Sequence, residues 1–234
     1  YKRQDSGCLL LDPATGQTLR EFQLPADERG EPPPWGFVGV YENLLLAGVG
    51  FGDYSTRLGY EYTPTDKRGP AWSPDRSSSL GLLAFDRRSG KTLWKVDARH
   101  GFLHNGIVAG GGRIYCLDKL PKRVEEQNKR RGAADAPAYR VVALDAATGK
   151  PLWSLSEDVF GSWLSYSEEH DVLLLAGAAA TDRSPDEVGK GIAAYRGADG
   201  SLIWKKPDLS YAGPCMIHND TIITNSTSYK ESQG

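Results

Sequence analysis

Histidines are the residues of this sequence best suited to metal or acid–base chemistry, and they lie in two kinds of position. His170 and His218 fall in short polar turns, whereas His100 and His104 lie close together in one connection between strands. A metal site needs three or more converging ligands with supporting partners. The sequence brings together only the pair His100 and His104, so we expect no metal site.

The sequence contains no convincing motif for disulfide, phosphate, nucleophile or haem chemistry. Cys8, Cys116 and Cys215 lie far apart, form no C-x-x-C pair, and are too few for a disulfide framework. Gly110–Gly112 looks like a phosphate loop, but it lacks the Lys-Ser/Thr and the helix that bind a phosphate. No serine or cysteine nucleophile motif and no C-x-x-C-H haem motif occurs. The sequence therefore indicates no nucleotide, haem or nucleophile site.

The composition favours a single β-rich domain. The chain has 234 residues and 28 Lys and Arg against 30 Asp and Glu, so its net charge of −2 attracts neither nucleic acid nor an anionic membrane. No apolar run approaches the roughly 20 residues that cross a bilayer, so we expect no transmembrane segment. The 27 Gly and 14 Pro supply turns, and the six Trp and 11 Tyr favour half-buried strands.

A turn motif recurs along the chain and predicts the architecture. The pattern D-x-x-[TS]-G, or a variant of it, occupies residues 11–16, 85–90, 144–149 and 195–200. Its aspartate can accept hydrogen bonds from turn N–H groups, and its glycine supplies the positive φ of a tight turn between antiparallel strands. Four residues after the glycine, the last three copies have a tryptophan and the first has an arginine: Trp94, Trp153, Trp204 and Arg20.

A second apolar hairpin lies between successive turns, so each repeat comprises four short strands. Unequal spacing about this common core indicates a β-propeller with loop insertions, since blades run about 40 to 50 residues. We predict one all-β domain over residues 1–234. Its complete four-stranded blades are predicted at about 35–97, 104–156 and 161–206, with half-blades at 7–24 and 211–225.

The motif and its tryptophan resemble the pyrroloquinoline quinone (PQQ) repeat family, which includes quinoprotein alcohol dehydrogenases and non-catalytic BamB-like members. The resemblance covers about residues 7–225 and implies a periplasmic or otherwise extracytoplasmic bacterial protein. It also implies that the three tryptophans dock between adjacent blades. Rings of this family usually have seven or eight blades, so we expect about four blades here to be part of such a ring.

How the ring closes stays open at this point. The half-blades at 7–24 and 211–225 can pair as a shared fourth blade of a four-bladed ring. Alternatively, missing sequence or another chain completes a larger ring, and this is the solution we favour. Free strand edges would otherwise recruit other chains.

The extra residues of the repeats all lie between the second and third strands, so they emerge on one face. They occupy residues 51–79, 119–138 and 178–190. The middle insertion is predicted to contain a short charged helix over 120–132, with Pro at its start and Gly after its end. The first insertion is rich in Tyr, Trp and Pro and forms either a small local core or a recognition surface. Loops on a rigid scaffold commonly carry function.

Residues that precede the first strands of blades are the best placed to face the central funnel of the ring. These candidates for cofactor or ligand binding are Trp35, His104, Asn105, Trp163 and Tyr211. The resemblance implies that a dehydrogenase would hold PQQ between a tryptophan and a disulfide of adjacent cysteines, beside Ca²⁺ and a catalytic Asp. This chain has no adjacent cysteines, so we expect neither cofactor, and we expect packing and hydrogen bonding from the five candidates.

The function expected from these observations is a non-catalytic, extracytoplasmic binding or scaffolding propeller. It would contact a protein or polymer partner through the face that carries the insertions, and it would not bind nucleic acid. The alternative is a PQQ-dependent alcohol dehydrogenase whose cofactor residues lie partly outside this segment. The identity of the ligand or partner cannot be inferred from residue types.

Overall fold

The computed structural model describes residues 7–26, 30–51, 77–120, 125, 138–177, 190–209 and 215–224. The chain divides into two compact units, Tyr1–His104 and Asn105–Gly234, which are described separately below. Most of the three predicted insertions lies outside the described residues. Of the predicted helix over 120–132, Glu125 is described between masked neighbours, and it is helical and buried.

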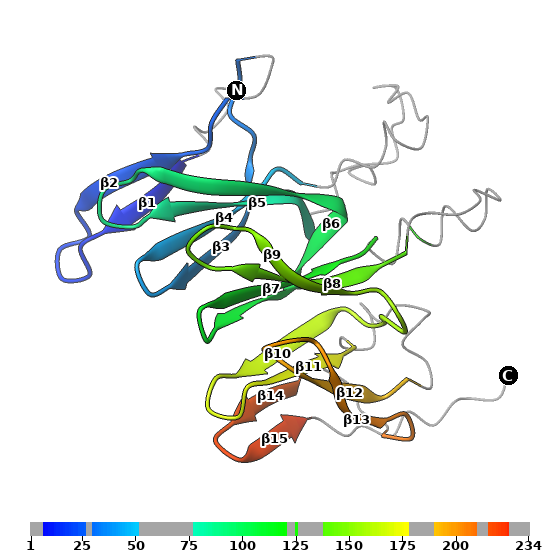
Figure 1. Cartoon of the computed structure of the whole chain (residues 1–234). Coiled ribbons are helices and arrows are strands. Elements are labelled where there is room, and N and C mark those ends of the chain that lie inside the picture. The colour runs from blue at the N-terminus through cyan, green and yellow to red at the C-terminus, as the bar shows by residue number, and fades with distance from the viewer. Residues whose placement is uncertain are drawn as a thin grey trace, which may run out of the picture. The chain divides into compact units, whose positions relative to one another are not determined.

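The first unit contains one hairpin and the first four strands of a seven-stranded sheet, whose fourth strand is long and continues into the second unit (Figure 1). We call each set of four successive antiparallel strands a blade and name its strands A to D in chain order. The hairpin supplies the C and D strands of a half-blade, β1 (Gly7–Leu11) and β2 (Thr18–Gln23). The blade consists of β3 (Trp35–Tyr41), β4 (Leu44–Val49), β5 (Ser78–Asp86) and the first part of the long strand β6 (Thr92–Gly110).

The second unit repeats this arrangement with two blades and a hairpin (Figure 1). The last part of β6 is the A strand of the first of these blades. Its other strands are β7 (Arg113–Asp118), β8 (Arg140–Asp145) and β9 (Pro151–Leu155). The next blade comprises β10 (Trp163–Ser167), β11 (Val172–Ala176), β12 (Ile192–Arg196) and β13 (Leu202–Lys206). The hairpin β14 (Cys215–His218) and β15 (Thr221–Thr224) supplies strands A and B of a half-blade.

The described residues therefore form an all-β structure of four-stranded antiparallel blades, which confirms the predicted fold class. None of the described helical residues belongs to a helix long and apolar enough to cross a membrane. The closure of a ring and the number of its blades stay predictions.

The recurrent turn has the structure that its sequence predicts. In the first three copies, Oδ1 of the aspartate accepts a hydrogen bond from the backbone N–H three residues later, at 2.6 to 2.9 Å. Hydrogen bonds from the residue three positions later are the largest cause that lowers the pKa of Asp12, Asp86 and Asp145. The four turn glycines have φ between 70° and 78°, a region that residues with a Cβ rarely adopt.

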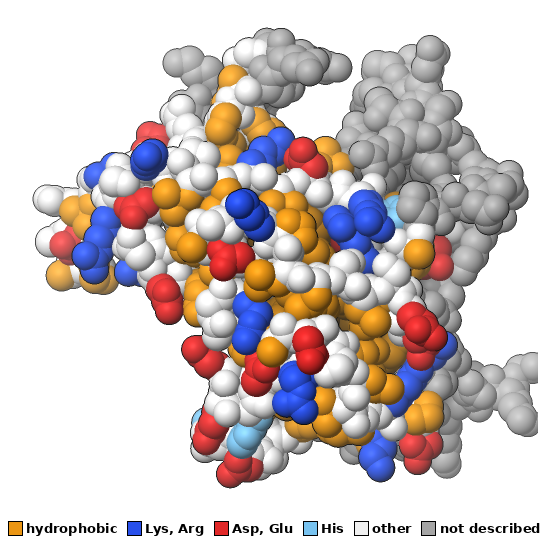
Figure 2. Space-filling view, viewed as in Figure 1, with side chains coloured by type: hydrophobic (Ala, Val, Ile, Leu, Met, Phe, Trp, Pro, Cys, Tyr) orange, Lys and Arg blue, Asp and Glu red, His pale blue; other side chains and the backbone are white. Residues whose placement is uncertain are grey.

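The core consists of the middle strands of the blades, which are buried on both faces. The four central residues of β8 and the first four of β12 are all buried, as their continuous apolar sequences predict. One core cluster lies in the first unit around Phe22, Leu83 and Phe85, and another lies in the second unit around Leu174, Ile192 and Cys215. Hydrophobic side chains also reach the surface among charged ones (Figure 2).

In two of the four copies, the residue four positions after the turn glycine contacts the turn of the following repeat. Trp153 donates a hydrogen bond from Nε1 to the carbonyl oxygen of Gly197, in the turn of the following blade, at 2.9 Å. Arg20, which replaces tryptophan in the first copy, donates from Nη1 to the carbonyl oxygen of Ser89 in the next turn, at 2.6 Å. Trp94 is buried and Trp204 is half-buried, so none of the three tryptophans lies on the solvent surface. The arginine therefore makes the same kind of turn contact as the tryptophan.

We expect Trp153→Ala to lower the free energy of unfolding by about 3 kcal/mol, because it removes a large packed side chain and a hydrogen bond. The neighbouring Leu152 is exposed, so Leu152→Ala should change the stability by less than about 0.5 kcal/mol. Urea unfolding of both variants measures the difference. Equal effects of the two substitutions would contradict the docking role of Trp153.

Candidate functional site

Trp35 and His104, the two predicted funnel residues of the first unit, lie at the same end of its blade. Trp35 is half-buried and stacks on Phe85, with 5.9 Å between ring centroids and 18° between planes. Its Nε1 is buried and has no hydrogen-bond partner among the described residues. His104 is half-buried and lies 6.1 Å from the ring of Phe37. Both side chains therefore belong to the packing of this blade.

His104 forms a hydrogen bond that the sequence did not reveal. Its Nε2 lies 2.8 Å from Oγ of Ser79, a residue that is fully buried in strand β5. Gly36 and Gly48 cover this hydroxyl so closely that a Cβ added to either would collide with it. A serine–histidine pair can activate a hydroxyl nucleophile. Here the enclosed hydroxyl cannot meet a substrate carbonyl, so the pair orients His104 within the blade.

Two of the three predicted funnel residues of the second unit are described, and they differ in exposure. Asn105, at the start of the A-strand portion of β6, is exposed. Trp163 begins β10, is half-buried, and donates from Nε1 to the carbonyl oxygen of Cys215 at 3.0 Å. Tyr211 lies outside the described residues. Asn105 is thus the described candidate of this unit whose side chain is available to a partner.

Buried charges lie at the end of the second unit where β7 finishes and β10 begins. Asp118 is fully buried and accepts a hydrogen bond from Nε of Arg140 at 2.9 Å. Lys119 is also fully buried, and its ammonium group donates to the carbonyl oxygen of Gly161 at 3.0 Å. The Asp118–Arg140 pair lies between neighbouring strands of one blade, whereas the Lys119 contact joins this blade to the segment that precedes β10.

A polar network occupies the opposite end of the same two blades. Nη1 of Arg113 donates to the hydroxyls of Tyr115 and Tyr166, at 2.9 and 3.2 Å, and to Oδ1 of Asp171 at 2.8 Å. Oδ2 of Asp171 accepts from the backbone N–H of Ala198 at 3.0 Å. Burial raises the pKa of both tyrosines, so they remain neutral. The network connects the β10–β11 turn of one blade to strand β7 of the neighbouring blade.

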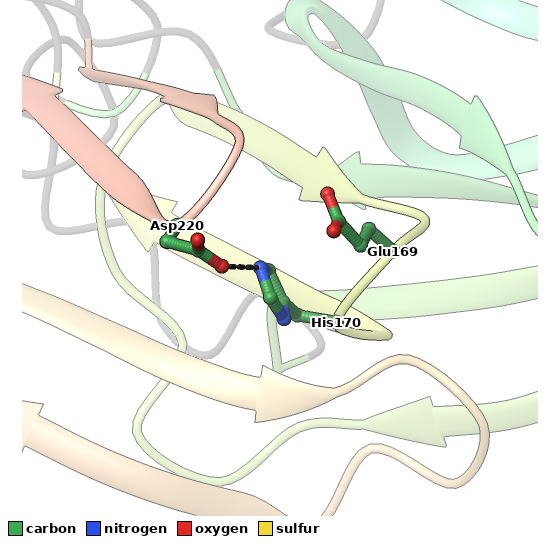
Figure 3. Close-up of side chains that lie close together, drawn as sticks. All are labelled: Glu169, His170 and Asp220. Carbon is green, nitrogen blue, oxygen red and sulfur yellow. Dashed lines mark ion pairs between the residues drawn. The ribbon is translucent and has the colours of Figure 1, made fainter.

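The turns at this end also bring together Glu169, His170 and Asp220 (Figure 3). Glu169 and His170 lie on the β10–β11 turn, and Asp220 lies on the β14–β15 turn. Nε2 of His170 is 2.8 Å from Oδ1 of Asp220, and one ligand atom from each of the three residues lies within 4.8 Å of the others. The three side chains are exposed and have the types that bind divalent cations. An exposed ion pair of this kind contributes little to stability.

The sequence indicated part of this arrangement. It placed His170 in an exposed turn, but the approach of Asp220 depends on how two hairpins pack. Likewise, Ser79 and His104 are separated by 25 residues, and Arg113 and Asp171 by 58. A local motif does not signal such pairs, because the partners meet only when distant strands pair or blades stack.

The residues present do not fit the PQQ site that the resemblance implies. The three cysteines are free thiols, and none is adjacent to another in the sequence. Burial raises the pKa of Cys215 to about 11 and also raises the pKa of Cys116, so both thiols are protonated at neutral pH. Trp163 is engaged with the backbone of Cys215. We therefore derive no step through a quinone cofactor.

Solved structures similar to this chain share its fold at low sequence identity. The computationally designed Ika8 protein has a TM-score of 0.55 and 10% identity, over 95% of this chain and 50% of that one. BamB from Moraxella catarrhalis has a TM-score of 0.52 and 12% identity, over 90% of this chain and 50% of BamB. The complex of KlAtg21 with the coiled coil of AgAtg16 has a TM-score of 0.54 and 10% identity, over 96% and 57% of the two chains. This chain thus spans about half the length of these structures.

A comparison with curated protein sequences found no match. The family model described as outer membrane protein assembly factor BamB, a model of PQQ-like repeats, matches residues 76–227, which is more than half of the chain. The matched segment contains Trp94, Trp153 and Trp204 and the strands that carry them. The chain therefore belongs to the PQQ-like repeat family of outer membrane protein assembly factor BamB, whose fold is a β-propeller.

Proposed function

We propose that this chain is a binding or scaffolding module of the bacterial cell envelope that holds a protein or polymer partner and catalyses no reaction. The observation that carries the proposal is the match of residues 76–227 to the family of outer membrane protein assembly factor BamB. The family also motivates the periplasmic location.

The chemistry of the described candidates supports a binding role over a catalytic one. His104 is held by Ser79, and Trp163 is held by the backbone of Cys215. Trp35 stacks within the core cluster of the first unit. Side chains that are engaged in this way rigidify a scaffold, and a rigid scaffold can present loops to a partner.

The two ends of the second unit offer different surfaces to a partner. The insertions at 119–138 and 178–190 connect β7 to β8 and β11 to β12 at the end where β10 begins. Asn105 is exposed at the start of the neighbouring A strand. The other end is occupied by the Arg113 network and by the short turns around Glu169. We assign partner binding to the first end, because the strands that flank both insertions end there and Asn105 is exposed at that end.

We expect a photo-crosslinking amino acid at Asn105 to form adducts with a specific partner in the cell envelope. The same amino acid at the exposed Glu169, on the opposite end of the unit, is the matched control and should form far fewer. Denaturing gels and mass spectrometry compare the two variants. Stronger adducts from Glu169 would contradict binding through the end that carries the insertions.

We expect PQQ and Ca²⁺ to show no saturable binding to this chain and no dye-linked oxidation of alcohols. The reason is that the chain lacks the adjacent cysteines that family dehydrogenases place against the cofactor. Fluorescence titration and the activity assay check this, with a quinoprotein alcohol dehydrogenase as the positive control. Stoichiometric binding with turnover would establish the dehydrogenase instead.

We expect the Ser79–His104 contact to contribute stability only. Ser79→Ala removes the hydrogen bond to Nε2 of the half-buried His104 and should lower the free energy of unfolding by about 1 to 2 kcal/mol. A cycle with His104→Ala and the double variant should show coupling of about 1 kcal/mol in urea unfolding. A serine-directed fluorophosphonate should not label the folded protein, and labelling at Ser79 would refute this assignment.

A further inference from the structure

The cluster of Glu169, His170 and Asp220 brings one imidazole and two carboxylates to the same place on the second unit (Figure 3). Glu169 and His170 come from the turn between β10 and β11, and Asp220 comes from the turn between β14 and β15. One ligand atom of each side chain lies within 4.8 Å of the other two. Because the two turns are far apart in the sequence, no local motif indicates this cluster.

The backbone that carries His170 is held on both sides by residues outside the cluster. Its own N–H donates a hydrogen bond to Oγ of Ser167 at 3.3 Å. The next residue, Asp171, accepts hydrogen bonds from Arg113 at 2.8 Å and from the backbone N–H of Ala198 at 3.0 Å. The carboxylate of Asp171 is thus engaged within the protein, whereas the imidazole of His170 is exposed and points toward the second hairpin (Figure 3).

The hairpin that carries Asp220 is fixed against the same blade. Asp220 lies in the two-residue turn between β14 and β15. At the start of β14, the carbonyl oxygen of Cys215 accepts a hydrogen bond from Nε1 of Trp163 at 3.0 Å. Cys215 is also buried in the core cluster that contains Ile192. Packing along the hairpin therefore sets the separation of the two turns, so the three side chains converge without needing an ion to bring them together.

The charges of the cluster favour a divalent cation. Nε2 of His170 lies 2.8 Å from Oδ1 of Asp220, and an imidazole supplies at most one positive charge. The carboxylate of Glu169 adds a second negative charge within 4.8 Å. Two carboxylates this close repel one another, and a divalent cation between them would neutralise both.

The mixed set of ligands selects zinc among the common divalent cations. Ca²⁺ and Mg²⁺ prefer six or more oxygen ligands, whereas Zn²⁺ binds imidazole nitrogen and carboxylate oxygen in a tetrahedron. Two such ligands, each about 2.0 Å from zinc, lie about 3.3 Å apart. The 2.8 Å between His170 and Asp220 is close to this separation, and the exposed side chain of Glu169 can rotate toward the ion. Three protein ligands leave one position for water.

We propose that Glu169, His170 and Asp220 bind one zinc ion, which joins the β10–β11 turn of a complete blade to the turn of the β14–β15 hairpin. The ion replaces a weak exposed ion pair by coordinate bonds from both turns, so it stabilises the hairpin against the blade. The site lies at the end of the unit opposite the insertions. It is therefore separate from the surface to which we assign partner binding.

Competition between the full chain and a chromophoric zinc chelator measures the affinity of the site. His170→Gln and Asp220→Asn should each weaken zinc binding at least about 10-fold, because losing even a group that only supports a ligand costs 10- to 100-fold. The matched controls are Glu168→Gln and His218→Gln, which change the same kinds of exposed side chain beside the same two turns. Both controls should bind zinc as tightly as the unmodified chain.

Thermal unfolding provides a second readout on the same variants. Zn²⁺ should raise the unfolding temperature of the unmodified chain and of both controls, because a ligand that binds the folded state stabilises it. It should not raise that of Asp220→Asn. Ca²⁺ and Mg²⁺ at the same concentration should have no effect. Circular dichroism without metal should be the same for all variants, since every substituted side chain is exposed.

Four results would overturn the inference. The first is an unmodified chain that does not compete with the chelator for zinc. The second is zinc binding that His170→Gln or Asp220→Asn leaves unchanged. The third is an equal loss of binding in the Glu168→Gln or His218→Gln control. The fourth is Ca²⁺ binding as tight as that of Zn²⁺, which would indicate a site made of carboxylates without the imidazole.

Discussion

The hydrogen bond from the docking residue of one repeat to the turn of the next is the constraint on which the stacking of blades depends. Trp153 makes it to Gly197, and Arg20 makes it to Ser89. The contact requires a turn with no Cβ at its glycine, because a Cβ added at Gly200 would lie 2.8 Å from the Trp153 ring. One short motif therefore sets both the local turn and the position of the following blade.

Two further polar contacts reinforce this stacking at the two ends of the second unit. Lys119 reaches the backbone of Gly161 at one end, and Arg113 reaches Asp171 at the other. Because their hydrogen bonds are satisfied inside the protein, these groups are poor candidates for catalysis and good ones for rigidity. This rigidity supports the scaffolding role proposed above.

The strand edges of the half-blades lack the pairing that stabilises the complete blades. Complete blades bury the apolar residues of strands B and C on both faces, whereas the half-blades leave the equivalent residues accessible to solvent. Propeller proteins avoid free edges because unpaired N–H and C=O groups attract other strands. In the complete blades, pairing of strand B with strand C satisfies those groups and buries the equivalent side chains, such as Leu83 and Leu173.

The sequence alone determined the strands, the turns, the family and the positions of the docking residues, because each is encoded within about ten neighbouring residues. D-x-x-[TS]-G specifies a turn through its own side chain and backbone, and continuous apolar runs specify strands that are buried on both faces. The tertiary structure decided which polar residues meet. Ser79 reaches His104, Arg113 reaches Asp171, and Asp220 reaches His170 only because strands distant in the sequence pair or stack. The tertiary structure also decided that the funnel candidates Trp35, His104 and Trp163 are half-buried while Asn105 is exposed, since burial depends on neighbours that no local pattern identifies.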